Sequence, residues 1–125
     1  MDVLLVEDDA LQRESLAAEL EEAGLEVETV EAADVALRLL HTRGAPPVVL
    51  TDLRLGKELG GLALGEAVLH GWPGVAVVYV TGYPQALCGR ALGVRECYVG
   101  KPVGAAALAG MVCRLVGRSG RDVVP

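Results

Sequence analysis

The sequence predicts an α/β protein in which a parallel β-sheet is covered by helices on both faces. Five apolar runs of strand length alternate with segments that have helical spacing. The runs span residues 3–6, 25–30, 48–53, 75–80 and 97–99. The first, third and fourth contain unbroken apolar stretches, as strands buried on both faces do. Repeated strand-then-helix order gives parallel strands joined by right-handed crossovers, so we expect a three-layer αβα sandwich around a five-stranded sheet.

The segments between the strands carry signals for the start and the end of helices. Asp9 stands three residues before Gln12, a spacing that resembles a capping box, and Gly24 supplies a C-terminal stop for the first helix. Apolar residues at helical spacing predict two further helices, which end near Gly44 and Gly71. Each predicted helix therefore lies between two predicted strands.

The last helix has the clearest pattern, whereas the segment before the fifth strand has the weakest. Apolar residues at positions i, i+3, i+4, i+7 and i+8 form one stripe: Leu108, Met111, Val112, Leu115 and Val116. The segment 84–92 is short and contains a glycine, so we expect the fourth of five helices to be short or irregular. Charged and apolar residues alternate over 26–28, which predicts an edge position for the second strand.

Length, charge and cysteine content narrow the class of protein. A chain of 125 residues forms one domain, which we assign to residues 1–117, with 118–125 as a C-terminal tail or the start of a linker. The net charge of −6 argues against direct binding to nucleic acid or to an anionic membrane. No apolar run approaches the ~18 residues of a membrane span, so we expect a cytoplasmic protein without membrane insertion. The three cysteines lack metal-site or disulfide spacing and are interpreted as reduced thiols.

Polar residues follow four of the predicted strands at their carboxyl ends, where open parallel sheets bind ligands. Glu7 and Asp8 follow the first strand, Asp52 ends the third, Thr81 the fourth, and Lys101 comes soon after the fifth. Carboxylates brought together raise one another's pKa unless a cation neutralises them. Their all-oxygen ligation suits Mg²⁺ (or Mn²⁺), and the sequence therefore predicts a divalent metal site at this edge.

Such a site favours phosphoryl chemistry. A carboxylate is a competent nucleophile toward a phosphoryl group and forms an aspartyl phosphate, which makes Asp52 the candidate phosphoacceptor. Lys101 supplies a compact positive charge for the phosphoryl oxygens, and Thr81 supplies a hydroxyl donor.

These residues resemble the receiver domains of two-component response regulators, which have the fold of the chemotaxis response regulator. The motifs VLLVEDD, VVLTDLRL, VVYVTGYP and YVGKPV follow the family's order over essentially the whole chain. The resemblance implies the flavodoxin-like strand order 2-1-3-4-5. It also implies that Glu7 and Asp8 hold Mg²⁺, that Asp52 is phosphorylated, and that the backbone carbonyl of Arg54 is a further metal ligand.

The resemblance also implies a conformational switch. Thr81 matches the switch hydroxyl, Tyr98 the aromatic rotamer switch, and Lys101 the lysine that precedes a usually cis peptide bond to proline, here Pro102. Two stretches depart from the family pattern. The glycine-rich loop LGKELGG replaces a short turn with a proline, and TGY resembles a subgroup whose fourth helix is degenerate.

The function implied is a phosphorylation-dependent signalling receiver. Asp52 would accept a phosphoryl group from a sensor histidine kinase or a histidine phosphotransfer protein, and the altered conformation would control a downstream protein. Such a receiver assists its own phosphotransfer and dephosphorylation but is not a multiple-turnover metabolic enzyme. Two alternatives stay open: a phosphorylation-independent adaptor, and an Mg²⁺-dependent phosphatase with an aspartyl-phosphate intermediate. Such a phosphatase usually needs a second acid two residues after the nucleophile, where this chain has Arg54.

Overall fold

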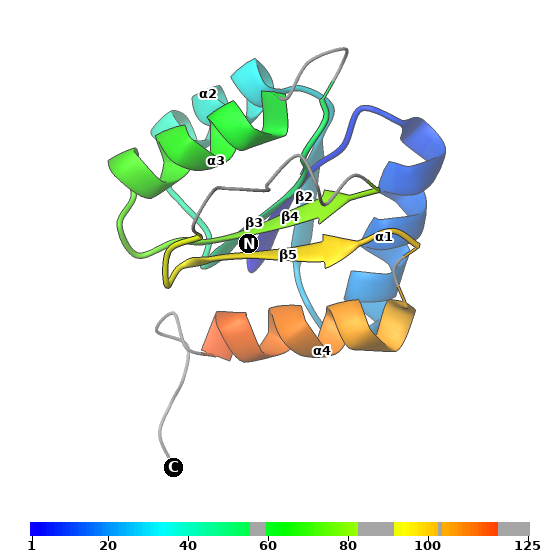
Figure 1. Cartoon of the computed structure of the whole chain (residues 1–125). Helices are drawn as coiled ribbons and strands as arrows, with labels where there is room; N and C mark the ends of the chain where they lie inside the picture. Colours follow the sequence, from blue (N-terminus) through cyan, green and yellow to red (C-terminus); the bar gives the residue numbers. More distant parts are fainter. Residues whose placement is uncertain (56–59, 83–91, 103, 118–125) are drawn as a thin grey trace.

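A computed structural model describes residues 1–55, 60–82, 92–102 and 104–117 (Figure 1). Five parallel strands form one sheet in the order β2-β1-β3-β4-β5. The strands are β1 (Val3–Val6), β2 (Val27–Val30), β3 (Val48–Asp52), β4 (Ala76–Thr81) and β5 (Glu96–Gly100). The described helices are α1 (Ala10–Glu22), α2 (Ala33–Arg43), α3 (Gly60–Gly71) and α4 (Ala105–Val116). The predicted α/β class and strand order are confirmed.

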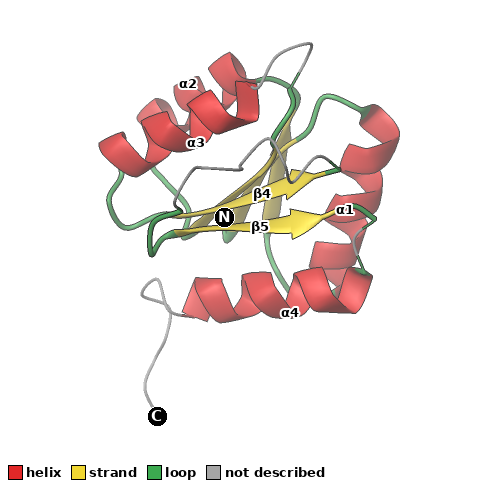
Figure 2. Cartoon of the chain, in the orientation of Figure 1, coloured by secondary structure: helices red, strands yellow, loops and turns green. Residues whose placement is uncertain are grey.

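The helices cover both faces of the sheet and complete the three predicted layers. Helices α2 and α3 lie on one face, and α1 and α4 lie on the other (Figure 2). Alternate residues of the central strands feed the two apolar layers: Leu4 and Val6 pack toward α2 and α3, whereas Val3 and Leu5 pack toward α1 and α4. None of the described helices has the length and apolarity needed to cross a membrane.

The ends of the first two helices follow the signals in the sequence. The carboxylate of Asp9 accepts a hydrogen bond from the Gln12 backbone N–H at 3.0 Å and so caps the start of α1. Only this half of a capping box forms within the described chain, because the Gln12 side chain binds elsewhere. Gly24 and Gly44 follow α1 and α2 with φ angles of 93° and 87°, a left-handed range that glycine adopts without strain.

The second strand is at an edge of the sheet, as predicted, but it begins two residues later than expected. The Asp2 backbone N–H donates to the carbonyl of Glu26 at 2.8 Å, and the Asp2 carboxylate accepts from the Glu26 backbone N–H at 2.8 Å. The Asp2 side chain thus takes the place of a backbone acceptor for Glu26, and regular pairing of β2 with β1 starts at Val27. The predicted short fourth helix and the tail 118–125 lie outside the described residues.

An arginine just before β5 joins the end of α3 to the start of β4. The guanidinium of Arg95 donates to the carbonyl of Leu69 at 3.0 Å, to that of Trp72 at 3.3 Å and to that of Val75 at 3.1 Å. The last carbonyls of a helix have no partner within the helix, so Arg95 supplies one from a distant segment.

We expect Arg95→Met to lower the free energy of unfolding by about 1–2 kcal/mol, because the apolar part of the side chain is kept while its hydrogen bonds are lost. Urea unfolding measures the change. Arg38→Met is the control, because the Arg38 guanidinium forms an exposed pair with Asp34 at 3.7 Å and such pairs contribute little. An equal loss in both variants would contradict this role for Arg95.

Candidate functional site

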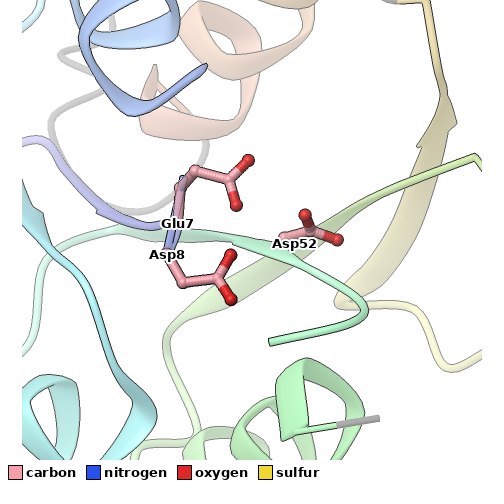
Figure 3. Close-up of side chains that lie close together, drawn as sticks. All are labelled: Glu7, Asp8 and Asp52. Atoms are coloured by element: carbon pink, nitrogen blue, oxygen red, sulfur yellow. The ribbon is translucent and has the colours of Figure 1, made fainter. Parts of the chain in front are cut away.

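Three carboxylates gather where β1 and β3 end. These strands are neighbours, with Val6 opposite Thr51, so Glu7 and Asp8 emerge beside Asp52. One oxygen from each of the three carboxylates lies within 4.8 Å of the others. The three side chains face a common space (Figure 3). Glu7 is buried, Asp52 is half-buried and Asp8 is exposed, so the cluster runs from the interior to the surface.

The donor set fits a hard divalent cation. Both carboxylate oxygens of Glu7 are buried, and neither accepts a hydrogen bond from the described part of the chain. A buried carboxylate without hydrogen bonds is costly, and a cation coordinated there would remove that cost. Oxygen ligands in a cluster that reaches the surface suit Mg²⁺ or Mn²⁺. The Arg54 backbone lies next to this cluster, because its N–H donates to Asp52 Oδ1 at 3.0 Å.

The same surroundings raise the pKa of Glu7 from 4.5 to about 7. Burial is the main cause, because it disfavours the charged form, and the negative charge of Asp52 adds to it. The positive charge of Lys101 lowers the pKa of Glu7, but it does not outweigh the causes that raise it, which include a smaller contribution from the charge of Asp8. In the protein without metal, Glu7 therefore holds a proton at a pH where an ordinary glutamate has lost it.

Lys101 brings a positive charge to the edge of the cluster. Its ammonium Nζ lies 3.1 Å from Asp52 Oδ2 and 3.9 Å from Glu7 Oε1. The Lys101 backbone N–H donates to the carbonyl of Thr81 at 2.8 Å, which fixes its main chain at the end of β4. The peptide bond between Lys101 and Pro102 is cis.

Thr81 lies on β4 and Tyr98 on β5, the two paired strands on the Lys101 side of the carboxylate cluster. Thr81 is the last residue of β4, is buried, and pairs in register with Gly100 of β5. Tyr98 is opposite Tyr79 and has 46% of its surface exposed. The structure thus brings Glu7, Asp8, Asp52 and Lys101 together, places Thr81 beside Lys101 through the main chain, and leaves the Tyr98 side chain turned partly to solvent.

Sequence reasoning assigned no role at the site to two residues that contact it. Gln12 accepts a hydrogen bond from the Lys101 ammonium at 2.8 Å through its side-chain oxygen. Gly61, in the first turn of α3, donates its N–H to the carbonyl of Leu53 at 3.0 Å. A Cβ at Gly61 would overlap the backbone carbonyl of Asp52, so only glycine lets α3 approach the strand this closely. The glycine-rich loop could have indicated such an approach, whereas the capping-box spacing of Gln12 predicts a different partner for its side chain.

A parallel five-stranded sheet with an acidic pocket and a lysine at its carboxyl edge is the architecture of receiver domains. The family model of the response regulator receiver domain matches residues 3–112. The chain therefore belongs to the response regulator receiver domain family. Receiver domains of two-component systems are signalling modules rather than metabolic enzymes.

Solved structures and curated proteins give the same family. A response regulator receiver domain protein from Clostridium thermocellum superposes with a TM-score of 0.81 at 25% identity, covering 97% of this chain and 98% of that chain. The receiver domain of NtrX from Brucella abortus gives a TM-score of 0.79 at 29% identity, covering 92% and 98%. An NtrX-like response regulator from Rickettsia conorii is 29% identical over 83 residues, which is 66% of this chain and 18% of that protein. The chain thus spans less than a fifth of the length of this curated relative.

Proposed function

We propose that Asp52 accepts a phosphoryl group from a sensor histidine kinase or a histidine phosphotransfer protein, with Mg²⁺ (or Mn²⁺) as the cofactor. The observation that carries this proposal is the cluster of three carboxylates within 4.8 Å, with the Lys101 ammonium 3.1 Å from Asp52. Glu7, Asp8, Asp52 and the Arg54 carbonyl would hold the metal. The receiver would comprise residues 1–117, and a cytoplasmic location is part of the same proposal.

The chemistry is a transfer between two nucleophiles. An oxygen of the Asp52 carboxylate forms a bond to phosphorus as the bond between phosphorus and the donor histidine nitrogen breaks, and the electron pair of that bond returns to the imidazole. Lys101 is already beside the attacking carboxylate, so its charge can stabilise the phosphoryl oxygens without reorganisation. When bound, the divalent cation would neutralise charge on the same oxygens.

The structural change proposed to follow involves the neighbouring strands. Thr81 would bind the phosphoryl group through its hydroxyl, and Tyr98 would turn inward behind it. Two observations support this: Thr81 ends β4 and binds Lys101 through its carbonyl, and Tyr98 stands half-exposed on the edge strand beside it. The altered surface around β5 would then be read by a downstream protein.

We expect Lys101→Ala to be labelled by acetyl phosphate and Mg²⁺, but about 10²-fold more slowly, because one charged donor to the phosphoryl group is lost. Intact mass against time measures labelling. The ring signals of Tyr98 in NMR spectra measure the response, and we expect them to shift in the labelled wild type but not in the labelled variant. Labelling at the wild-type rate, or a full Tyr98 shift in Lys101→Ala, would contradict this role.

The two alternative functions have less support at the site. A phosphatase needs a further acid near the nucleophile, but Arg54 occupies the expected position, and the nearby Asp9 is engaged in capping α1. Turnover of a small phosphomonoester would favour the phosphatase. An adaptor would not require a lysine paired with the candidate nucleophile. Equal affinity for a partner with and without a phosphoryl mimic would favour the adaptor.

A further inference from the structure

The ammonium of Lys101 has a neighbour that the proposed chemistry does not use. Within the part of the chain that the structure describes, three oxygen atoms surround it: Gln12 Oε1 at 2.8 Å, Asp52 Oδ2 at 3.1 Å and Glu7 Oε1 at 3.9 Å. The nearest of the three belongs to a neutral amide on α1, whose residue is 89 positions away in the sequence. A lysine ammonium has three donor protons, and Gln12 accepts one of them.

The main chain of Gln12 is held firmly relative to the acidic pocket. Its own N–H donates to the Asp9 carboxylate at 3.0 Å. The next residue, Arg13, donates from its guanidinium to the backbone carbonyl of Glu7 at 2.9 Å. The first turn of α1 is therefore attached to the segment that carries the buried carboxylate of Glu7. The backbone from which the Gln12 side chain extends is held in place by these hydrogen bonds.

The three neighbours lie at different depths. Glu7 is 1% exposed, whereas Gln12 is an exposed residue at the surface of α1. The two carboxylates attract the ammonium toward the buried side chain of Glu7, and the amide opposes that movement from the solvent side. We propose that Gln12 is a positioning residue, which holds the Lys101 ammonium beside Asp52 on the solvent side of the three carboxylates, where an incoming phosphoryl group would meet it. This inference rests on the proposed phosphoacceptor function.

A neutral acceptor suits this task better than a charged one. An amide oxygen orients the ammonium but adds no charge, so the lysine remains available to the phosphoryl oxygens. A carboxylate at the same position would pair with the lysine more strongly and would add a fourth negative charge facing the incoming anion. Gln12→Glu keeps the shape of the side chain and an acceptor oxygen but adds a negative charge, so it tests the effect of charge alone. Gln12→Met removes the acceptor but keeps the length and the helix propensity.

The test is a double-mutant cycle that uses acetyl phosphate as donor at saturating Mg²⁺. We expect Gln12→Met to slow labelling about fivefold when Lys101 is present, a change on the scale of one ordinary hydrogen bond, because this bond is exposed to solvent. In the Lys101→Ala background the same substitution is expected to have no further effect, because residues that act through one another are not additive. Gln12→Glu is expected to slow labelling as well. Ala18→Met, which places methionine on an exposed position of α1, is the matched control and should label like wild type.

Two further readouts separate positioning from other effects. Mg²⁺ affinity is expected to be unchanged in Gln12→Met, and a fall in affinity that matches the fall in labelling would overturn the proposal. Exchange of the Lys101 ammonium protons with water, observed by NMR with ¹⁵N-lysine, is expected to be faster in Gln12→Met, and an unchanged rate would also overturn it. If the wild type itself is not labelled, the phosphoacceptor proposal fails. If the wild type is labelled and Gln12→Met has equal effects in both backgrounds, only the positioning role fails.

Discussion

Asp52→Asn is expected to abolish the phosphoryl adduct and to leave the fold intact. The substitution removes the nucleophilic carboxylate but keeps the shape of the side chain and an oxygen that can accept from the Arg54 backbone N–H, a bond of 3.0 Å in the structure. An amide is a poor nucleophile toward phosphorus, so labelling is lost rather than slowed. The measurement is intact mass after incubation with acetyl phosphate and Mg²⁺, together with far-UV circular dichroism to confirm the fold.

The chain supplies a matched control for this experiment. Asp9→Asn replaces the carboxylate that follows Asp8 in the sequence and caps α1, and asparagine caps helices about as well as aspartate. We expect this variant to be labelled like wild type. A single adduct on wild type and on Asp9→Asn, absent without Mg²⁺ and absent from Asp52→Asn, would support the assignment. An adduct on Asp52→Asn at the wild-type rate would refute it.

The part of this fold that could be predicted is the part encoded locally. Continuous apolar runs located the central strands because both faces of those strands are buried. Charged and apolar residues alternate over 26–28, which predicted an edge strand because such a strand is not buried on both faces, and β2 is at the edge of the sheet. The carboxyl ends of parallel strands share one edge, so their order alone brought Glu7, Asp8, Asp52 and Lys101 to one site.

The parts that could not be predicted depend on contacts between distant segments. The start of the second strand is set by the carboxylate of Asp2, and the end of α3 is completed by Arg95 from the approach to β5. Gln12 matched a capping box by its spacing, yet its side chain binds Lys101. A local pattern identifies possible partners, but a polar side chain binds whichever partner the tertiary fold brings within reach. The switch roles of Thr81 and Tyr98 stay predictions.

The buried carboxylate of Glu7 leads to the second large expected effect, a dependence of stability on pH that the metal removes. Its pKa is raised from 4.5 to about 7 by burial and by the charge of Asp52. Between these values the folded protein binds more protons than the unfolded chain, so the free energy of unfolding falls as the pH rises. This contribution is fully present below 4.5 and is lost above about 7. It amounts to roughly 3 kcal/mol over the whole range, and about 2 kcal/mol between about pH 5.5 and about pH 8.

Urea unfolding in the presence of a chelator at those two pH values measures the effect. Glu7→Gln carries no titrating proton, so we expect its stability to change less with pH than that of wild type and to exceed wild type at the higher pH. The exposed Glu14→Gln is the control and should behave like wild type. Parallel pH dependences for Glu7→Gln and wild type would show that Glu7 does not titrate in this range.

Mg²⁺ is expected to reverse the trend, because it binds the ionised carboxylates and competes with the proton on Glu7. Affinity for Mg²⁺ should therefore weaken as the pH falls below about 7, the pKa of Glu7 without metal. At high pH, where the protein without metal is least stable, saturating Mg²⁺ should give the largest gain in the free energy of unfolding. Glu7→Gln should lose most of that gain, since one negative ligand is gone. A gain that is the same at both pH values, or the same in Glu7→Gln, would place the metal away from this carboxylate. The expected result would instead mean that the buried carboxylate at the end of β1 is the feature that prepares this acidic cluster for a cation.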